Sequence, residues 1–231
     1  MKLPSSNINQ TSIQLLFSGR EKVLLPHYQR PYSWTTKEID ELFMDIKEGF
    51  EEAIKNNNVS DGYLLGNIIF LTFDRKELFL LDGQQRLTTL FVIFEELKKH
   101  INPVYSGLFK IFNDFLYEVD CYGKSDYKLK LRRQEVNGNI LDFEINNEIK
   151  KYIIKKTQTD LVYDKFDDEG EMINFLLNTN FIVQNYIGNS SNEDYKNKTF
   201  STILKYFVKF NTRGKSFSND EMINAINLLE K

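Results

Sequence analysis

Apolar positions in the first half of the chain predict a buried strand followed directly by a helix. Residues 78–81 form an unbroken apolar run, as strands buried on both faces do. From Leu87 to Leu97 apolar residues recur at helical spacing, and the basic residues 98–100 suit the C-terminus of a helix. The pattern therefore predicts a tight strand-to-helix turn at residues 82–86.

A second strong helix signal lies upstream of this unit. Residues 35–38 read as a capping box, which predicts the start of a helix. Its expected buried face carries Ile39, Leu42, Phe43, Ile46 and Phe50. Asp45 on the opposite face either is solvated or reaches a metal or an arginine. Gly66 interrupts an apolar run, which indicates a bend or a close approach of another group to the backbone.

The order of these elements predicts an α+β fold. We expect a small mixed sheet with helices over residues 1–105, and a mainly helical extension over residues 106–231 that completes the same unit. The expected strands lie at residues 22–25, 63–73, 78–81, 128–131 and 181–187, and further helices at 13–17, 109–119, 149–154, 172–177, 199–210 and 222–229.

The turn at residues 82–86 has two interpretations. Asp82 followed by Gln85 fits a capping box, and Gly83 could simply ease the turn. Gln84 and Arg86, however, are long polar residues that a cap does not require. The free backbone N–H groups and positive dipole of a helix start can hold an anion. The residues alone leave both interpretations open.

Two other loops carry polar residues that local structure does not need. Pro26 and Pro31 exclude regular structure around Arg30, so a rigid loop is expected there. Asn211 and the glycine three residues later suit a helix stop, which does not need Arg213. We interpret Arg30 as a candidate ligand contact.

Composition limits the classes of partner. The 231 residues carry a net charge of −3, so no global positive field attracts nucleic acid. The residues Lys128, Lys130, Arg132 and Arg133 form a local basic cluster, which is either a DNA-binding patch or a solvated strand edge.

Cysteine, histidine and hydropathy exclude several further classes. Cys121 is the only cysteine, so an internal disulfide is impossible, and two histidines make a Cys/His zinc site implausible. No apolar run approaches the roughly 20 residues that span a bilayer, and no signal-peptide pattern is present, so we expect a cytoplasmic protein without a membrane partner. The chain also lacks a Gly-x-x-x-x-Gly-Lys-Ser/Thr P-loop.

Four ordered blocks carry a family resemblance. They are Asp-Gly-Gln-Gln-Arg followed by Leu-Thr-Thr-Leu at residues 82–90, and the segments 25–34, 63–68 and 210–214. Together they resemble the N-terminal domain family of GmrSD-type restriction systems, over about residues 20–231. Domains of this family have a ParB/sulfiredoxin-like fold and accompany prokaryotic defence against foreign, often modified, DNA.

The resemblance implies a nucleotide-binding domain that hydrolyses a nucleoside triphosphate with Mg²⁺. Arg30, Arg86 and Arg213 are then expected to converge on one anion pocket, and Asp82 to hold the metal. The implied catalytic residues are Asp82, Gln84, Gln85 and Arg86. The implied nucleotide-binding residues are Gln29, Arg30, Trp34, Gly83, Thr88, Asn211, Arg213 and Gly214.

The alternative function is a nucleotide-switched module that binds or senses DNA without turnover. A sulfiredoxin-like redox enzyme is rejected, because the central turn contains no cysteine. Relatives often carry a C-terminal His-Asn-His nuclease domain. The chain has no such motif, so we expect that it does not cut DNA alone and that such a domain or a partner chain would supply this activity.

Overall fold

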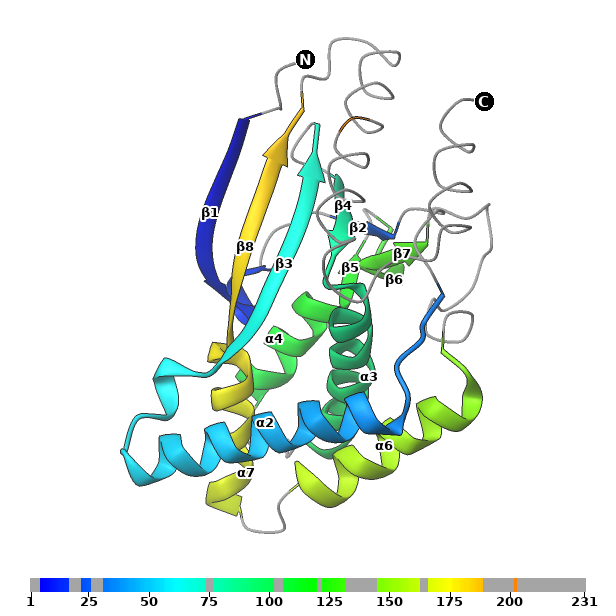
Figure 1. Cartoon of the computed structure of the whole chain (residues 1–231). Helices are drawn as coiled ribbons and strands as arrows, with labels where there is room; N and C mark the ends of the chain where they lie inside the picture. Colours follow the sequence, from blue (N-terminus) through cyan, green and yellow to red (C-terminus); the bar gives the residue numbers. More distant parts are fainter. Residues whose placement is uncertain are drawn as a thin grey trace.

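A mixed six-stranded sheet organises the part of the chain that the structure describes (Figure 1). This computed structural model describes residues 5–16, 22–25, 31–73, 77–101, 106–119, 122–131, 145–162, 166–188 and 202. The strand order is β1-β8-β3-β4-β2-β7. The strands are β1 (Ser5–Ser12), β2 (Lys22–Leu25), β3 (Leu64–Thr72), β4 (Glu77–Asp82), β7 (Leu129–Leu131) and β8 (Asn180–Ile187).

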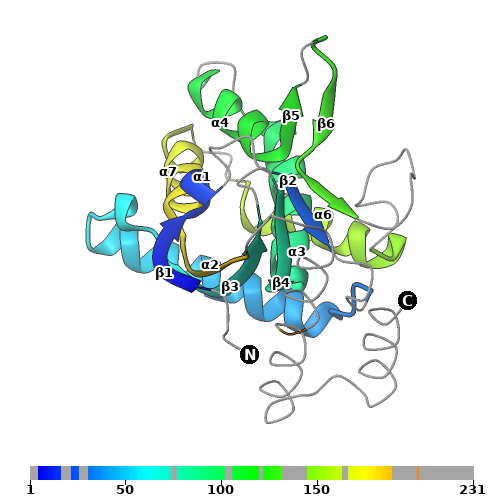
Figure 2. The same cartoon turned by 90° about the horizontal axis from the view of Figure 1, so that it is seen from above.

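Neighbouring strands in this sheet run both parallel and antiparallel. The β1·β8 and β3·β4 pairs are antiparallel, whereas the β3·β8, β2·β4 and β2·β7 pairs are parallel. A separate two-stranded ribbon of β5 (Tyr117–Val119) and β6 (Ser125–Tyr127) extends away from the other described elements (Figure 2). The α+β class is therefore confirmed.

Helices pack on one face of the sheet, around α3. The helices are α1 (Ile13–Leu16), α2 (Thr36–Lys55), α3 (Gln84–His100), α4 (Ser106–Leu116), α6 (Asn147–Asp160) and α7 (Phe166–Asn178), with a short 3₁₀ turn η1 (Val59–Asp61). Helix α3 contacts α4 and α6, and α2 contacts α6 and α7. None of the described helices combines the length and apolar character that a bilayer crossing requires.

The core explains why α3 and β4 occupy the centre. Phe91 and Phe94 of α3 are fully buried, and both pack against Phe115 of α4, with ring centroids 4.9 and 4.8 Å from that of Phe115. Strand β4 is buried on both faces: Leu80 joins the helix-covered core, while Phe79 lies in a second apolar cluster on the opposite face. The two-sided burial predicted for residues 78–81 is confirmed.

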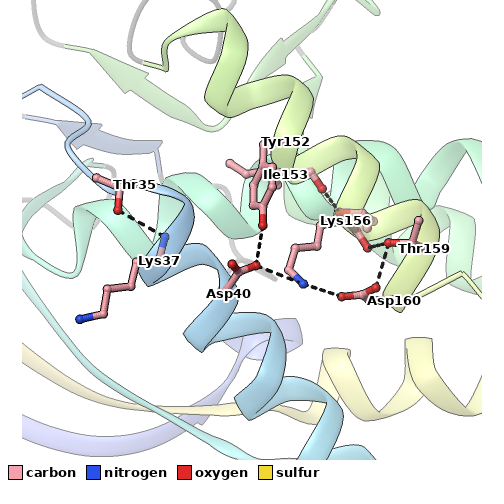
Figure 3. A network of polar contacts seen from close by, with 9 residues as sticks. Thr35, Lys37, Asp40, Tyr152, Ile153, Lys156, Thr159 and Asp160 are labelled. Carbon is pink, nitrogen blue, oxygen red and sulfur yellow. Dashed lines mark hydrogen bonds and ion pairs between the residues drawn. The ribbon is translucent and has the colours of Figure 1, made fainter.

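A polar network joins α2 to α6 (Figure 3). The Asp40 carboxylate accepts hydrogen bonds from the Tyr152 hydroxyl at 2.7 Å and the Lys156 ammonium at 3.1 Å. Lys156 also pairs with Asp160 at 2.8 Å. The hydrogen bond from Tyr152 and the charge of Lys156 lower the pKa of Asp40. Asp40 therefore tethers the two helices.

Most predicted elements in the described part are confirmed. The capping box opens α2, with Thr35 and Glu38 each bonding to the other's backbone, and the five expected apolar residues of α2 are buried. Three helices have other boundaries than expected. The helix expected at 109–119 spans Ser106–Leu116 and residues 117–119 form β5, while α6 and α7 are longer than the segments 149–154 and 172–177. The segment 222–229 and, apart from Thr202, the segment 199–210 lie outside the described residues.

The strand at residues 180–187 is more central than the sequence indicated. β8 lies between β1 and β3, so the sheet extends beyond residues 1–105, and the segment after residue 106 contributes strands as well as helices. The division of the chain at residue 105 stays a prediction.

Candidate functional site

The central turn has the predicted strand-to-helix geometry. Strand β4 ends at Asp82, α3 begins at Gln84, and Gly83 between them has φ +92°, in the left-handed region that favours glycine. A Cβ at this position would also lie 3.1 Å from Cγ1 of Ile68 and 3.3 Å from the carbonyl oxygen of Asn67. The conformation therefore favours glycine here, and a Cβ would fit only if its neighbours shifted by a few tenths of an ångström.

The capping-box interpretation of this turn is wrong. The Asp82 carboxylate accepts from the adjacent Gly83 N–H at 2.8 Å, and no side chain caps the N-terminus of α3. The Gln85 side chain points instead to another segment. This helix start therefore lacks the cap that usually satisfies N-terminal N–H groups, which is the condition under which it can bind an anion.

The guanidinium of Arg86 is held against strand β3. A Cβ on Gly66 would lie 2.9 Å from Nη1 and 3.2 Å from Cζ of Arg86, so the group occupies the space that this glycine leaves. Gly66 has φ +125° and sits at a β-bulge, which confirms the close approach predicted there. Among the described residues, no side chain or carbonyl forms a hydrogen bond or ion pair with the guanidinium.

Two carboxylates act on Arg86 from a longer distance. Burial lowers the pKa of Arg86, while the charges of Asp82 and Asp45 oppose this effect. Asp45 itself is exposed on α2, as expected of its solvated face, and forms no ion pair with Arg86 among the described residues. A partly desolvated cation without a direct carboxylate partner is well suited to an incoming anion.

Thr88 adds a buried hydroxyl on the next turn of α3. The residue is 1% exposed, and its Oγ1 has no hydrogen-bond partner within the described part of the chain. Such a hydroxyl costs roughly 1–3 kcal/mol when unsatisfied, so buried polar atoms of this kind need an explanation. A ligand at the start of α3 is one explanation, and the role of Thr88 in nucleotide binding stays a prediction.

Gln85 holds the loop at residues 31–34. Its Oε1 accepts from the backbone N–H groups of Ser33 at 2.8 Å and Trp34 at 3.4 Å, and its Nε2 donates to the carbonyl of Pro31 at 3.4 Å. The end of the proline-bounded loop therefore faces the central turn. The sequence suggested a catalytic role for Gln85 but not this contact.

A hydroxyl pair adds a second attachment of the same loop. Tyr32 and Thr89 lie 2.7 Å apart through their oxygens, and Thr89 Oγ1 donates to the Gln85 carbonyl at 2.8 Å. Sequence reasoning did not assign a role to Thr89, which is fully buried, or to Gly66 at the site. An uncharged Thr in an apolar helix gives little signal on its own.

The structure gathers some predicted site residues and does not describe others. The residues that lie together around the start of α3 are Trp34, Asp82, Gly83, Gln84, Gln85, Arg86 and Thr88. The residues outside the described ranges are Gln29, Arg30, Asn211, Arg213 and Gly214. The convergence of three arginines therefore stays a prediction.

Asp82 is the one metal ligand that the resemblance implies. Among the described residues, no group of three or more His, Cys, Asp or Glu side chains could hold a metal ion. Asp82 is exposed at the end of β4. Mg²⁺ in nucleotide sites uses one or two carboxylates together with phosphate oxygens, and Asp82 fits that donor set.

The basic cluster near residue 130 is partly buried. Lys128 is 5% exposed, and its backbone bonds to Val23 and Leu116 at 2.9 Å each. Both interpretations of this cluster, a DNA patch and a solvated edge, are therefore wrong for Lys128. The side chains of Lys130, Arg132 and Arg133 lie outside the described part.

Comparison with known proteins identifies the family. A search of curated proteins found no match. The model of the GmrSD restriction endonuclease N-terminal domain matches residues 13–228, which is nearly the whole chain. The uncapped turn and the loop that faces it fall within this match, and the chain belongs to the GmrSD restriction endonuclease N-terminal domain family.

Proposed function

We propose that this domain binds a nucleoside triphosphate with Mg²⁺ at the start of α3 and hydrolyses it, within a ParB/sulfiredoxin-like fold. One observation carries the proposal: the uncapped N-terminus of α3 lies beside the Arg86 guanidinium, which has no direct partner among the described residues. Backbone N–H groups and a guanidinium are both phosphate-binding groups, and here they share one helical turn.

Each residue of the turn has a proposed role. Gly83 lets phosphate approach the backbone, and Arg86 stabilises charge that develops during phosphoryl transfer. Gln84 positions the attacking water, and Asp82 holds Mg²⁺, which bridges phosphate oxygens. Arg30 and Arg213 would offset the remaining phosphate charge.

One observation favours the second candidate function, a nucleotide switch that binds or senses DNA without turnover. The side-chain amide of Gln85, which the sequence suggested for catalysis, is engaged with the backbone of Ser33 and Pro31. Fewer groups then remain to activate a water. Under this alternative the nucleotide changes the loop and is released intact.

We also propose where the nuclease chemistry of the system resides. The family is described as the N-terminal domain of a restriction endonuclease. Cleavage of DNA would then belong to a His-Asn-His nuclease domain or to a partner chain, controlled by nucleotide at the site described above.

Isothermal titration with the four common triphosphates, with and without Mg²⁺, tests the proposal. We expect one triphosphate to bind, more tightly with Mg²⁺, and Arg86→Ala to weaken binding by at least about tenfold, since a charge-assisted hydrogen bond contributes about 1.5–3 kcal/mol. Lys37→Ala is the matched control, because Lys37 is an exposed cation on α2. Absence of binding by folded wild-type protein would overturn the proposal.

Phosphate release separates hydrolysis from switching. Release above background that disappears in Arg86→Ala supports an NTPase. Binding without release supports the switch, and release that is unchanged in Arg86→Ala places the activity outside this site.

A further inference from the structure

We propose that Gln85, Thr89 and Tyr32 form a clasp that replaces the missing helix cap and preorganises the anion site. The clasp is defined as these three side chains together with the backbone of residues 31–34. This inference rests on the proposed nucleotide site, and it makes Gln85 a positioning residue instead of a catalytic one.

The first part of the clasp is the Gln85 amide. Its oxygen accepts two backbone N–H groups and its nitrogen donates to one carbonyl, so both ends of the amide are engaged by the loop. Gln85 itself is 8% exposed. A side chain used in this way has little remaining capacity to bind phosphate or position a water.

The second part is the hydroxyl pair, in which the direction of the bonds can be deduced. Thr89 has one hydroxyl hydrogen, and the Gln85 carbonyl is a pure acceptor 2.8 Å away. If Thr89 donates there, the Tyr32 hydroxyl must be the donor across the 2.7 Å contact. Burial raises the pKa of Tyr32 to about 12, so this donor keeps its proton at neutral pH.

Both parts of the clasp meet on Gln85, within the first turn of α3. Its side chain holds the loop and its carbonyl accepts from Thr89, while its backbone N–H lies at the second position of the helix. Helix ends fray unless a cap satisfies them. A clasp attached from the side restrains this turn and leaves its N-terminal N–H groups open to a ligand.

Ring packing keeps the loop in place independently of the clasp. Tyr32 and Trp34 pack edge to face with centroids 6.5 Å apart, and both rings contact the main core. Removing one hydroxyl therefore should not release the loop or unfold the protein. The expected effect is a less ordered helix start, which weakens ligand binding by loss of preorganisation.

The test compares clasp variants with matched variants elsewhere. Tyr32→Phe and Thr89→Val each remove one hydroxyl of the clasp, and Gln85→Ala removes the amide. Tyr152→Phe and Thr157→Val are the controls, because Tyr152 bonds Asp40 and Thr157 donates to Ile153 within α6, away from the loop. Thr89→Ser keeps the hydroxyl and should therefore behave as the wild type does.

Two measurements need no nucleotide. Hydrogen exchange of residues 87–89 reports the first turn of α3, because the Leu87 N–H donates to the Gly83 carbonyl at 3.0 Å. The emission of Trp34, the only tryptophan in the chain, reports the loop. We expect faster exchange in all three clasp variants, a change in Trp34 quenching by acrylamide in Gln85→Ala, and wild-type behaviour in both controls and in Thr89→Ser.

The third measurement is the dissociation constant for the triphosphate that the wild-type protein binds. We expect it to rise about 2- to 10-fold in Tyr32→Phe, the range of one net hydrogen bond, and to stay within twofold in Tyr152→Phe. Wild-type exchange in the clasp variants would overturn the inference whatever binds. An unchanged dissociation constant in variants with faster exchange would overturn preorganisation, whereas no binding by the wild type would overturn the proposed function.

Discussion

The Arg86 guanidinium lies directly on the backbone of Gly66, 20 positions earlier in the sequence and on a different element. The bulge at Gly66 and the absence of a side chain there create the space that the guanidinium occupies. The cation is thus held by packing, and no described carboxylate forms a direct ion pair with it. This arrangement leaves its hydrogen-bond donors available to a ligand.

Gly66→Ala should therefore impair both stability and triphosphate binding. The added Cβ would lie 2.9 Å from Nη1 of Arg86, and φ +125° is unfavourable for alanine. We expect a loss of about 1–3 kcal/mol in the free energy of unfolding and weaker triphosphate binding, measured by urea titration and calorimetry. Gly107→Ala is the control, because nothing lies within 4 Å of a Cβ there. Wild-type affinity in Gly66→Ala would show that Arg86 does not need this position.

The Asp40 network should couple α2 to α6 energetically. Asp40→Asn removes the negative charge that both Lys156 and Tyr152 contact, while the ion pair between Lys156 and Asp160 remains. Because the site is partly exposed, we expect Asp40→Asn to lower the free energy of unfolding by about 0.5–1.5 kcal/mol. A double-mutant cycle with Tyr152→Phe should be non-additive, and additive losses would contradict a shared network.

Glu96 should make the protein sensitive to acid. Burial acts to raise the pKa of Glu96, but hydrogen bonds from Lys99, Gln158 and His100 outweigh it and lower the pKa. A pKa that is lower in the folded state stabilises the protein above the ordinary glutamate pKa, and this stabilisation is lost as the pH falls toward the lowered value. In urea titrations, the free energy of unfolding should fall more between pH 7 and pH 3.5 in the wild type than in Glu96→Gln. Equal losses would contradict this account.

Tyr32 should give the opposite dependence at alkaline pH. Its pKa in the folded state, about 12, exceeds the ordinary value of 10.0. The contribution of Tyr32 to the free energy of unfolding is therefore complete below pH 10 and is lost as the pH rises toward 12. Between pH 8 and pH 11, the free energy of unfolding should fall by about 1 kcal/mol more in the wild type than in Tyr32→Phe, as measured by chemical denaturation. Tyr122→Phe serves as the tyrosine control, because Tyr122 is 92% exposed. If the free energy of unfolding falls as steeply with pH in Tyr32→Phe as in the wild type, the assignment to Tyr32 is refuted.

The chain alone should leave plasmid DNA intact. Its two histidines, at positions 27 and 100, do not form a His-Asn-His motif. Incubated with supercoiled plasmid and Mg²⁺, with or without a triphosphate, the protein should produce no nicked form on an agarose gel. Nicking that is lost in Arg86→Ala would instead place the nuclease chemistry at the start of α3.

Local sequence was sufficient for the central turn and for most elements, although not for β1 or β5. The capping box at Thr35 and Glu38, the two-sided apolar run of β4 and the periodic face of α3 were all predictable, since each leaves its signal in the spacing of residues close in the chain. Gly66 could likewise be recognised as a place of close approach, although not the group that approaches it.

Tertiary structure decided which groups meet. Gln85 fits a local capping box, yet its side chain bonds to residues more than 50 positions away. Asp40 lies on the polar side of α2 and bonds to Tyr152, 112 positions away. The insertion of β8 between β1 and β3 is equally non-local. Such contacts depend on strand order and helix packing, which place side chains together without leaving a periodic signal in the sequence. The candidate residues of the turn were therefore readable from the chain, whereas the contact of the Gln85 side chain with residues 31–34 was decided by packing.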